Sequence, residues 1–339
     1  MSWVSCISLV TPVGYSAASS IAAMRGKIAA FNELSYHDAE GEPIIGATVD
    51  ALPLKLRGRE RISALVKLAF EQLDADTVTG LPWGQMPLLL CTHENEMPGG
   101  RLKGILAGIT LPDGRGLTGP KLLHIAGGPV AVFTALSHAE TLLKSEGYPA
   151  CIIVAVDSLV DARTLSWLDL HQRLKTSAVT DGLVPGEAAG ILVVTRDAAS
   201  LTAISILGIG FGVEGSTLFN ETPFRADGLS AALKAALADA GVPMHKVSFR
   251  LSDVAGESYA FEELVLAQMR NMREVRPCQD VWHAADCIGD SGAAAGIIQF
   301  AWAEQAYARN YAPGKLAALH ASSCFGPKAA AIVAPRRPS

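Results

Sequence analysis

Several short segments of this chain are apolar at almost every position, which restricts its possible folds severely. Two examples are "CIIVAV" at 151–156 and "AGILVVT" at 189–195. A strand that is apolar on both faces must be covered on both sides, as in a sheet that lies between layers of helices. Further strands of this kind are expected at Trp3–Ser8, Pro87–Cys91, Ala203–Ile209, Ser248–Ser252, Leu316–Ser322 and Ala329–Val333.

Helical periodicity alternates with these strands. Apolar residues recur at spacings of three and four, which is typical of amphipathic helices. The segments with this pattern are Gly58–Leu73, Pro129–Ser145, Leu229–Ala240, Glu262–Met272 and Ala293–Arg309. The alternation of strands and helices predicts an α/β fold.

The two halves of the chain resemble each other. "GGPVAVFTALSHAETLL" and "GDSGAAAGIIQFAWAEQA" are both turns of small residues that lead into a long apolar helix, and each is followed by a strand and a closing hairpin. A repeat of about half the chain predicts two similar βα units packed together. We place the boundary in "RDAASL", so that the halves are 1–197 and 198–339.

The net charge and the cysteines exclude several classes of protein. A net charge of -5 gives no electrostatic reason to expect nucleic acid, and there is no basic run or long apolar stretch that would indicate a membrane. The N-terminus lacks the basic start of a signal peptide. The six cysteines are scattered, which fits buried thiols in a reducing cytoplasm better than disulfides or a zinc site. We therefore expect a cytoplasmic protein without a bound metal.

The turn before the helix at 129–145 has the form of a site for a nucleophile. Free N–H groups at a helix N-terminus favour negative charge, so that a thiol or hydroxyl placed there is activated. The turn reads Ala126, Gly127, Gly128 and Pro129. None of these residues has a nucleophilic side chain, and proline at this position suits the first turn of a helix.

Four stretches resemble the β-ketoacyl synthases of the thiolase superfamily. They are "VTPVG" at 10–14, "DGLVPGEAAGILVV" at 181–194, "CIGDSGAAAG" at 287–296 and "SSCFGPKAAAIV" at 322–333. They occur in the family order and span almost the whole chain, and "DGLVPGEAAG" is the most specific of them. The resemblance implies a five-layer αβαβα thiolase fold built from two similar βα halves, with no cofactor.

The same resemblance implies that the catalytic residues of the family are missing. The family cysteine that accepts the acyl group falls at Pro129, or at Gly128 with a slip of one position. The two family histidines fall at Ala255 and Asp290. A carboxylate accepts hydrogen bonds and cannot stabilise an oxyanion as an imidazole N–H does. The resemblance therefore implies that ordinary decarboxylative condensation is lost.

A pocket remains expected at the degenerate site. Its expected substrate-binding residues are Gly127, Gly128, Asp290, Cys324 and Phe325, the last of which aligns with a gating phenylalanine of the family. Cys324 is more simply explained as a structural thiol than as a replacement nucleophile. The polar loop 91–100, with Cys91 at its start, is interpreted as a connection.

Two functions from different classes stay open. The first is a catalytically inactive protein that acts by binding, as a homodimeric adaptor or as a partner subunit in the way of chain-length factors. Degenerate relatives of this kind also resemble accessory proteins encoded beside bacterial secretion effectors, including those of type VI systems. The alternative is an acyltransferase of fatty-acid or polyketide metabolism with altered chemistry, in which Cys324, Cys91 or a group on the substrate does the work.

The resemblance also implies an arrangement and an oligomer. The helices at 129–145 and 293–309 are expected side by side at the centre of the fold. The strand within "PKLLHIAG", 120–127, is expected to pair with its mate across a twofold axis, since an apolar edge strand needs cover. We therefore expect a homodimer, with a protein client, an acyl carrier or a synthase as further partners.

Overall fold

Ten strands form one mixed sheet in which each half of the chain contributes five neighbouring strands. The computed structural model describes residues 2–73, 81–98, 105–106, 109, 116–117, 119–196, 204–274 and 279–336. The strand order is β10-β9-β11-β12-β8-β1-β7-β6-β4-β5. The first half supplies β1 (Ser2–Val10), β4 (Leu88–Thr92), β5 (Leu122–Ala126), β6 (Ala150–Ser158) and β7 (Glu187–Thr195). The second supplies β8 (Ile204–Val213), β9 (Phe249–Ser252), β10 (Asp280–His283), β11 (Ala317–Ser322) and β12 (Pro327–Pro335).

The two sets of five strands have the same internal order. Counted along the chain within each half, both sets run third, second, fourth, fifth, first. The sets meet where the first strands pair, in a short antiparallel contact between β1 and β8 that joins Val4 to Ile204 and Ser2 to Ile206. The prediction of two similar βα halves is therefore confirmed. The predicted boundary itself, between 197 and 198, lies outside the described residues.

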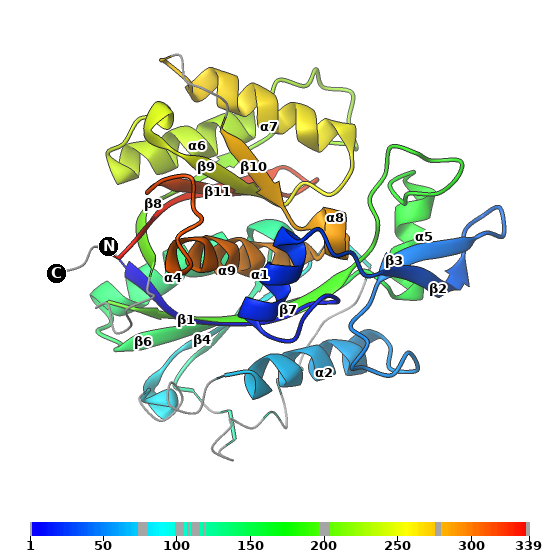
Figure 1. Ribbon diagram of the computed structural model, residues 1–339, viewed down its shortest axis with the longest axis horizontal. Coiled ribbons are helices and arrows are strands. Elements are labelled where there is room, and N and C mark those ends of the chain that lie inside the picture. The colour runs from blue at the N-terminus through cyan, green and yellow to red at the C-terminus, as the bar shows by residue number, and fades with distance from the viewer. Residues whose placement is uncertain are drawn as a thin grey trace.

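The two sets of five strands form two layers, with one layer of helices between them and one on the outer side of each. The molecule therefore has the five layers αβαβα (Figure 1). Helices α6 (Asp227–Ala240) and α7 (Ser258–Asn271) cover the strands of the second half, and α2 (Gly58–Glu71) covers those of the first. Between the two sets of strands lie α1 (Ala17–Arg25), α4 (Ala131–Ser145) and α9 (Ala295–Ala308). This arrangement confirms the predicted fold class.

The central helices α4 and α9 are packed closely against each other. The close packing requires glycine at position 296 of α9, because a Cβ atom added there would lie 2.7 Å from Cβ of Val132 in α4. The rings of Phe133 and Phe300 are 6.2 Å apart at their centroids. Most side chains of α9 are buried all round, as expected of a helix between two sheets. The predicted placement of the two helices is confirmed.

Each central helix begins with a short 3₁₀ turn. The turns are η2 (Gly128–Val130) and η4 (Gly292–Ala294), and both start with a glycine whose φ is +51°. This left-handed conformation favours glycine over residues that carry a Cβ. The sequence placed both helix starts two residues early, because a 3₁₀ turn carries the same apolar pattern as the first turn of an α-helix.

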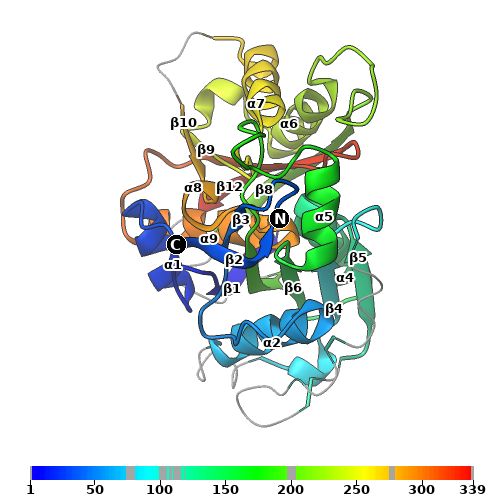
Figure 2. The ribbon, with the colours of Figure 1, turned by 90° about the vertical axis from the view of Figure 1, so that its right-hand side faces the viewer.

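Several shorter elements lie beside the layers and were not predicted. They include the two-stranded sheet of β2 (Phe31–His37) and β3 (Pro43–Ala47), which lies next to α5 (Ala162–Leu170) at one end of the molecule (Figure 2). The others are α8 (Ala285–Ile288) and the 3₁₀ turns η1 (Trp83–Gln85) and η3 (Met244–Lys246). Residues of β2 and α5 line the groove described below, whereas η1 and η3 come before β4 and β9 and so lie toward the opposite ends of these strands.

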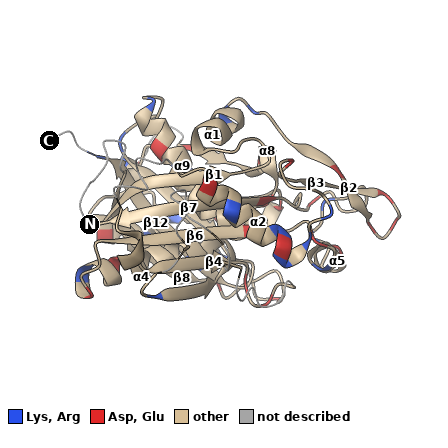
Figure 3. Ribbon diagram, turned by 90° about the horizontal axis from the view of Figure 1, so that it is seen from below, with Lys and Arg blue, Asp and Glu red and all other residues tan. Residues whose placement is uncertain are grey.

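Charged residues of both signs are interspersed on the described ribbon, and α2 carries acidic and basic side chains together (Figure 3). Within the described ranges, none of the helices combines the length and the apolar character needed to cross a bilayer.

Candidate functional site

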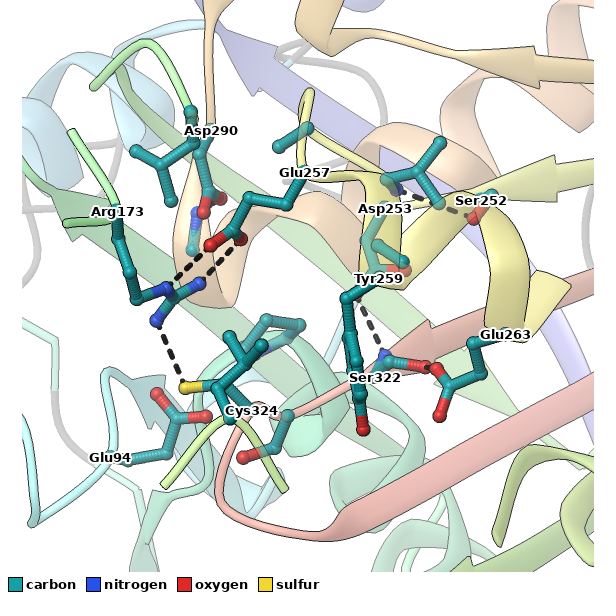
Figure 4. Close-up of a pocket in the computed structure, with 18 of the residues that line it drawn as sticks. Glu94, Arg173, Ser252, Asp253, Glu257, Tyr259, Glu263, Asp290, Ser322 and Cys324 are labelled. Carbon is teal, nitrogen blue, oxygen red and sulfur yellow. Dashed lines mark hydrogen bonds and ion pairs between the residues drawn. The ribbon is translucent and has the colours of Figure 1, made fainter. Parts of the chain in front are cut away.

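A pocket of about 80 Å³ lies where the two central helices begin. Four positions that the sequence singled out share its wall, namely Pro129, Ala255, Asp290 and Cys324. They come from four separate segments: the turn before α4, the loop after β9, the segment before α9 and the turn between β11 and β12. The fold therefore brings the predicted site residues together, and Figure 4 shows the polar side chains around them.

Glu94, from the loop after β4, occupies the space in front of the turn that begins α4. A Cβ atom at Gly128 would lie 2.2 Å from the Glu94 carboxyl, so the carboxyl packs directly against the glycine backbone. Burial raises the pKa of Glu94 to about 7, against the opposing effect of a hydrogen bond from Ser323. Glu94 is thus a partly protonated carboxyl beside Pro129, in the position where the resemblance implies a catalytic thiol.

Asp157, at the end of β6, lies in the same way against the turn that begins α9. A Cβ atom at Gly292 would lie 2.2 Å from Oδ2 of Asp157, and this oxygen accepts a hydrogen bond from Ala293 N–H at 2.9 Å. The other oxygen lies 3.5 Å from Nδ1 of His93. Burial by itself lowers the pKa of His93, yet the hydrogen bond and the charge of Asp157 outweigh it and raise that pKa. His93 and Asp157 therefore form a partly buried pair between the two turns.

Asp290 and Asp253 add two more buried carboxyls. Oδ1 of Asp290 accepts a hydrogen bond from Gly292 N–H at 2.8 Å, and Oδ2 of Asp253 accepts one from Ser322 N–H at 2.8 Å. Burial raises the pKa of Asp290 to about 6 and that of Asp253 to about 7, although these hydrogen bonds act in the opposite direction. Both carboxyls therefore only accept hydrogen bonds at high pH, whereas near pH 7 a fraction of each is protonated and can donate one.

An ion pair between Arg173 and Glu257 forms another side of the pocket (Figure 4). It is bidentate: Nε and Nη2 of Arg173 each lie 2.7 Å from an oxygen of Glu257. The remaining Nη1 donates to Sγ of Cys324 at 3.1 Å. Burial nevertheless raises the pKa of the Cys324 thiol to about 12, so the thiolate form is scarce at neutral pH.

A second ion pair is buried beneath α7. Nζ of Lys328 lies 2.9 Å from Oε1 of Glu263, and both side chains are only 1% exposed. Ser322 donates its hydroxyl hydrogen to the other oxygen of Glu263 at 2.5 Å, and Lys328 also donates to the Ser323 carbonyl at 3.0 Å. The ring of Tyr259 covers the ammonium at 5.7 Å. The charges of this pair are therefore satisfied internally.

The other predicted substrate-binding residues lie beside the pocket and not in its wall. Phe325 stacks on Phe219 with ring centroids 5.1 Å apart and lies 6.0 Å from the ring of Trp167. Gly127 and Gly128 form the turn behind Glu94 and Pro129. Phe325 thus belongs to an aromatic cluster next to the site, because the turn after Cys324 directs its ring outward from the carboxyls.

A wider groove of about 380 Å³ adjoins the pocket. The two share four wall residues, which are His93, Met97, Asp157 and Leu159. The outer part of the groove carries the exposed side chains of Arg57, Arg59 and Arg163, and the guanidinium of Arg57 lies 5.1 Å from the ring of Tyr36. The pocket therefore opens toward a basic surface.

The loop 91–100, which the sequence analysis interpreted as a connection, contributes residues to the pocket wall. His93, Glu94 and Met97 all line the pocket, because the loop leaves β4 at the end of the sheet where the central helices begin. Residues 99 and 100 lie outside the described residues. The polar composition of the loop was the signal for this role. Arg173, Asp253 and Glu257 had no comparable signal, since tertiary packing alone brings them to the pocket.

The other described thiols, Cys6, Cys91, Cys151 and Cys287, all lie within strands or a helix. Cys91 is fully buried in β4, and burial raises its pKa well above its usual value. Cys278 lies outside the described residues. Within the ranges that the structure describes, no cluster of three or more His, Cys, Asp or Glu side chains has the arrangement of a metal site.

No family model matches the sequence, and no curated protein matches it. Solved structures do match over nearly the full length of both chains. The ishigamide ketosynthase/chain length factor is 19% identical, with 99% of each chain covered and a TM-score of 0.70. The ketosynthase ApeO in complex with its chain length factor ApeC, from Xenorhabdus doucetiae, is matched at 14% identity and a TM-score of 0.77, with 99% of this chain and 98% of that chain covered.

A third match is the AntDE:AntF complex, in which a type II PKS acyl-carrier protein is bound to its ketosynthase. It is 13% identical, with 99% of each chain covered and a TM-score of 0.80. At these identities the likeness concerns the fold. The chain has the thiolase-type fold of ketosynthases and chain length factors.

Proposed function

We propose that this chain is a catalytically inactive thiolase-fold protein that acts by binding, as a homodimeric accessory protein or as the partner subunit of another protein. The observation that carries the proposal is the set of carboxyls around the degenerate positions. Asp290 stands where the resemblance implies a histidine, and Glu94 fills the space in front of Pro129.

Carboxylates at these positions oppose condensation chemistry. Attack on a thioester carbonyl develops negative charge on its oxygen, which enzymes stabilise with N–H or cationic donors. Glu94, Asp253 and Asp290 become negative as pH rises through about 6 to 7, and a negative group repels an oxyanion. The cations of the pocket, Arg173 and Lys328, are already paired with carboxylates. This distribution of charge supports a binding role.

The thiols support the same proposal. A nucleophilic cysteine needs a depressed pKa, whereas burial raises the pKa of both Cys324 and Cys91. Incubation with an acyl-CoA or a cerulenin-like probe, followed by intact-mass measurement, tests this point. We expect no adduct on the folded protein. A stoichiometric adduct that disappears in Cys324→Ala, with Cys151→Ala as the matched control, would identify Cys324 as a nucleophile and overturn the proposal.

The partner is the second part of the proposal. The ketosynthases matched above occur in complexes with a chain length factor or with an acyl-carrier protein. Strand β5 is an edge of the sheet, and it pairs with β4 alone among the described strands. An edge of this kind suits a twofold mate or a related subunit. A role beside a bacterial secretion effector, of the type VI kind, is a further form of the proposal, and the identity of neighbouring genes tests it.

The alternative is a cytoplasmic acyltransferase with altered chemistry. The groove with Arg57, Arg59 and Arg163 favours it, because these guanidinium groups would attract a phosphate-bearing thioester toward the pocket. The two functions differ in one observable: a transferase releases free thiol from an acyl-CoA catalytically, and a binding protein does not.

A further inference from the structure

The charges of the pocket do not balance. Arg173 is paired with Glu257, Lys328 with Glu263, and the side chain of His93 with Asp157. Three carboxyls that line the same cavity have no ion-pair partner within the described chain, and these are Glu94, Asp253 and Asp290. Cys324 and Tyr259 add no further negative charge, since burial raises the pKa of both and keeps them neutral.

These carboxyls keep acceptor positions free. Backbone N–H groups bond to one oxygen of Asp253 and to one oxygen of Asp290, and each carboxylate has room for about four hydrogen bonds. Their pKa values, raised to about 7 for Asp253 and about 6 for Asp290, mean that the pocket takes up protons when nothing else neutralises it. A bound cation would replace those protons.

A second, independent observation comes from His320 in β11. Its side chain lines the pocket and is 1% exposed, and neither ring nitrogen has a hydrogen-bond partner among the residues that the structure describes. Burial, together with the charge of Arg250, lowers its pKa to about 3, so the ring is neutral and offers one donor and one acceptor. A buried polar group without a hydrogen-bond partner destabilises a protein, and a ligand group that bonds to it would remove that penalty.

The cavity is large enough for a small organic molecule. A single water needs about 10–15 Å³ of cavity measured in this way, whereas the pocket has about 80 Å³. Leu159, Leu168 and Leu229 contribute apolar surface to its wall, which suits a short carbon chain.

We propose that the pocket binds a small organic cation, a primary ammonium on a short carbon chain with a second polar group. The ammonium lies among Glu94, Asp253 and Asp290, and the second polar group bonds to His320. This inference goes beyond the proposed function, because an inactive protein and a transferase could both hold such a ligand.

Titration calorimetry with methylammonium, ethanolamine and putrescine tests the proposal, with acetate and ethylene glycol as anionic and neutral controls. We expect the amines to bind and both controls to give no heat. Binding should release protons, seen as a dependence of the heat on the ionisation enthalpy of the buffer. The affinity should rise about tenfold or more between pH 6 and pH 8, since each carboxyl must lose its proton to hold the cation.

Matched variants locate the site. Asp290→Asn and Asp253→Asn should each weaken putrescine binding about tenfold or more, at unchanged or increased thermal stability because a buried charge is removed. Glu146→Gln, an exposed carboxylate paired with Lys121, should leave binding unchanged. His320→Leu should weaken ethanolamine and putrescine while leaving methylammonium unaffected.

Three results would overturn the proposal: no binding of any amine, equal binding of ethylene glycol, or full affinity in both Asn variants. None of them bears on the proposed lack of catalysis, which is measured with thioesters. Conversely, thioester turnover would refute the inactive function while leaving amine binding intact.

Discussion

At the scale of single residues, the two central helices begin in the same way. Gly128 and Gly292 are both left-handed and both lie against a carboxylate, Glu94 in one half and Asp157 in the other. Each carboxylate fills the volume that a side chain at the glycine would need. A nucleophile at either glycine would require both a new backbone conformation and removal of a buried acid.

Replacing one of these acids tests its protonation state. Glu94→Gln keeps the shape of the side chain and removes its charge. The folded pKa of about 7 lies above the usual 4.5, so the folded state holds a proton that the unfolded state releases, and this carboxyl lowers stability as pH rises from about 4.5 to 7. The variant should therefore be more stable than the wild type by on the order of 3 kcal/mol at pH 8, and by much less at pH 5.

Urea denaturation at the two pH values measures this difference. Glu146→Gln serves as the control, because the Glu146 side chain is 43% exposed and pairs with Lys121 at the surface, where ion pairs contribute little. A Glu94→Gln variant that is equally stable or less stable than the wild type at pH 8 would show that Glu94 is ionised and stabilised in the fold.

At the scale of elements, the sequence predicted the long helices and the buried strands because their apolar periodicity is strong. It missed β2 and α5, in which polar residues interrupt the pattern, and β3, a strand of five residues that contains a proline and a glycine. The site was predictable only where motifs carried it, at Pro129, Ala255, Asp290 and Cys324. The partners of these residues come from segments up to about two hundred residues away, and no local pattern encodes such contacts.

The contact between α4 and α9 depends on the absence of a side chain at Gly296. Gly296→Leu would drive a branched side chain into Val132, whose Cβ lies 2.7 Å from the position of the new Cβ. Overpacking of a close-packed core costs about 1–3 kcal/mol or more. We expect the variant to lose at least that much free energy of unfolding, measured by urea denaturation.

Gly215→Ala is the matched control for this contact. A Cβ at position 215 would meet no atom of the described residues within 4 Å, so the stability should be nearly unchanged. If the Gly296 variant were as stable as the Gly215 variant, the close packing of the two helices would be refuted.

At the scale of the whole molecule, the two halves share a strand order and meet at β1 and β8, which leaves β5 and β10 as the outer strands of the sheet. Leu122 in β5 is 61% exposed. An apolar side chain on an open sheet edge favours association with another chain. The proposed dimer would continue the sheet through this edge.

Light scattering at micromolar protein concentration tests the dimer. We expect twice the monomer mass for the wild type, and a monomer mass for Leu122→Asp, since a charge buried in the interface opposes association. Val265→Asp, at an exposed apolar position on α7, should remain dimeric. A monomeric wild type, or a Leu122→Asp variant that still dimerises, would contradict an interface at β5.

Product formation from carrier-bound acyl and malonyl thioesters shows whether the chain combines the ketosynthase fold with a loss of its chemistry. We expect no condensation product and no release of CO₂ above background from the wild type. Pro129→Cys should stay near background as well, because the loss of each oxyanion donor costs on the order of 10²–10³ in rate and Ala255 and Asp290 remain unchanged. Turnover by the unmodified protein that persists in Cys324→Ala would refute the inactive function, because it would require a catalytic centre that uses neither Pro129 nor Cys324.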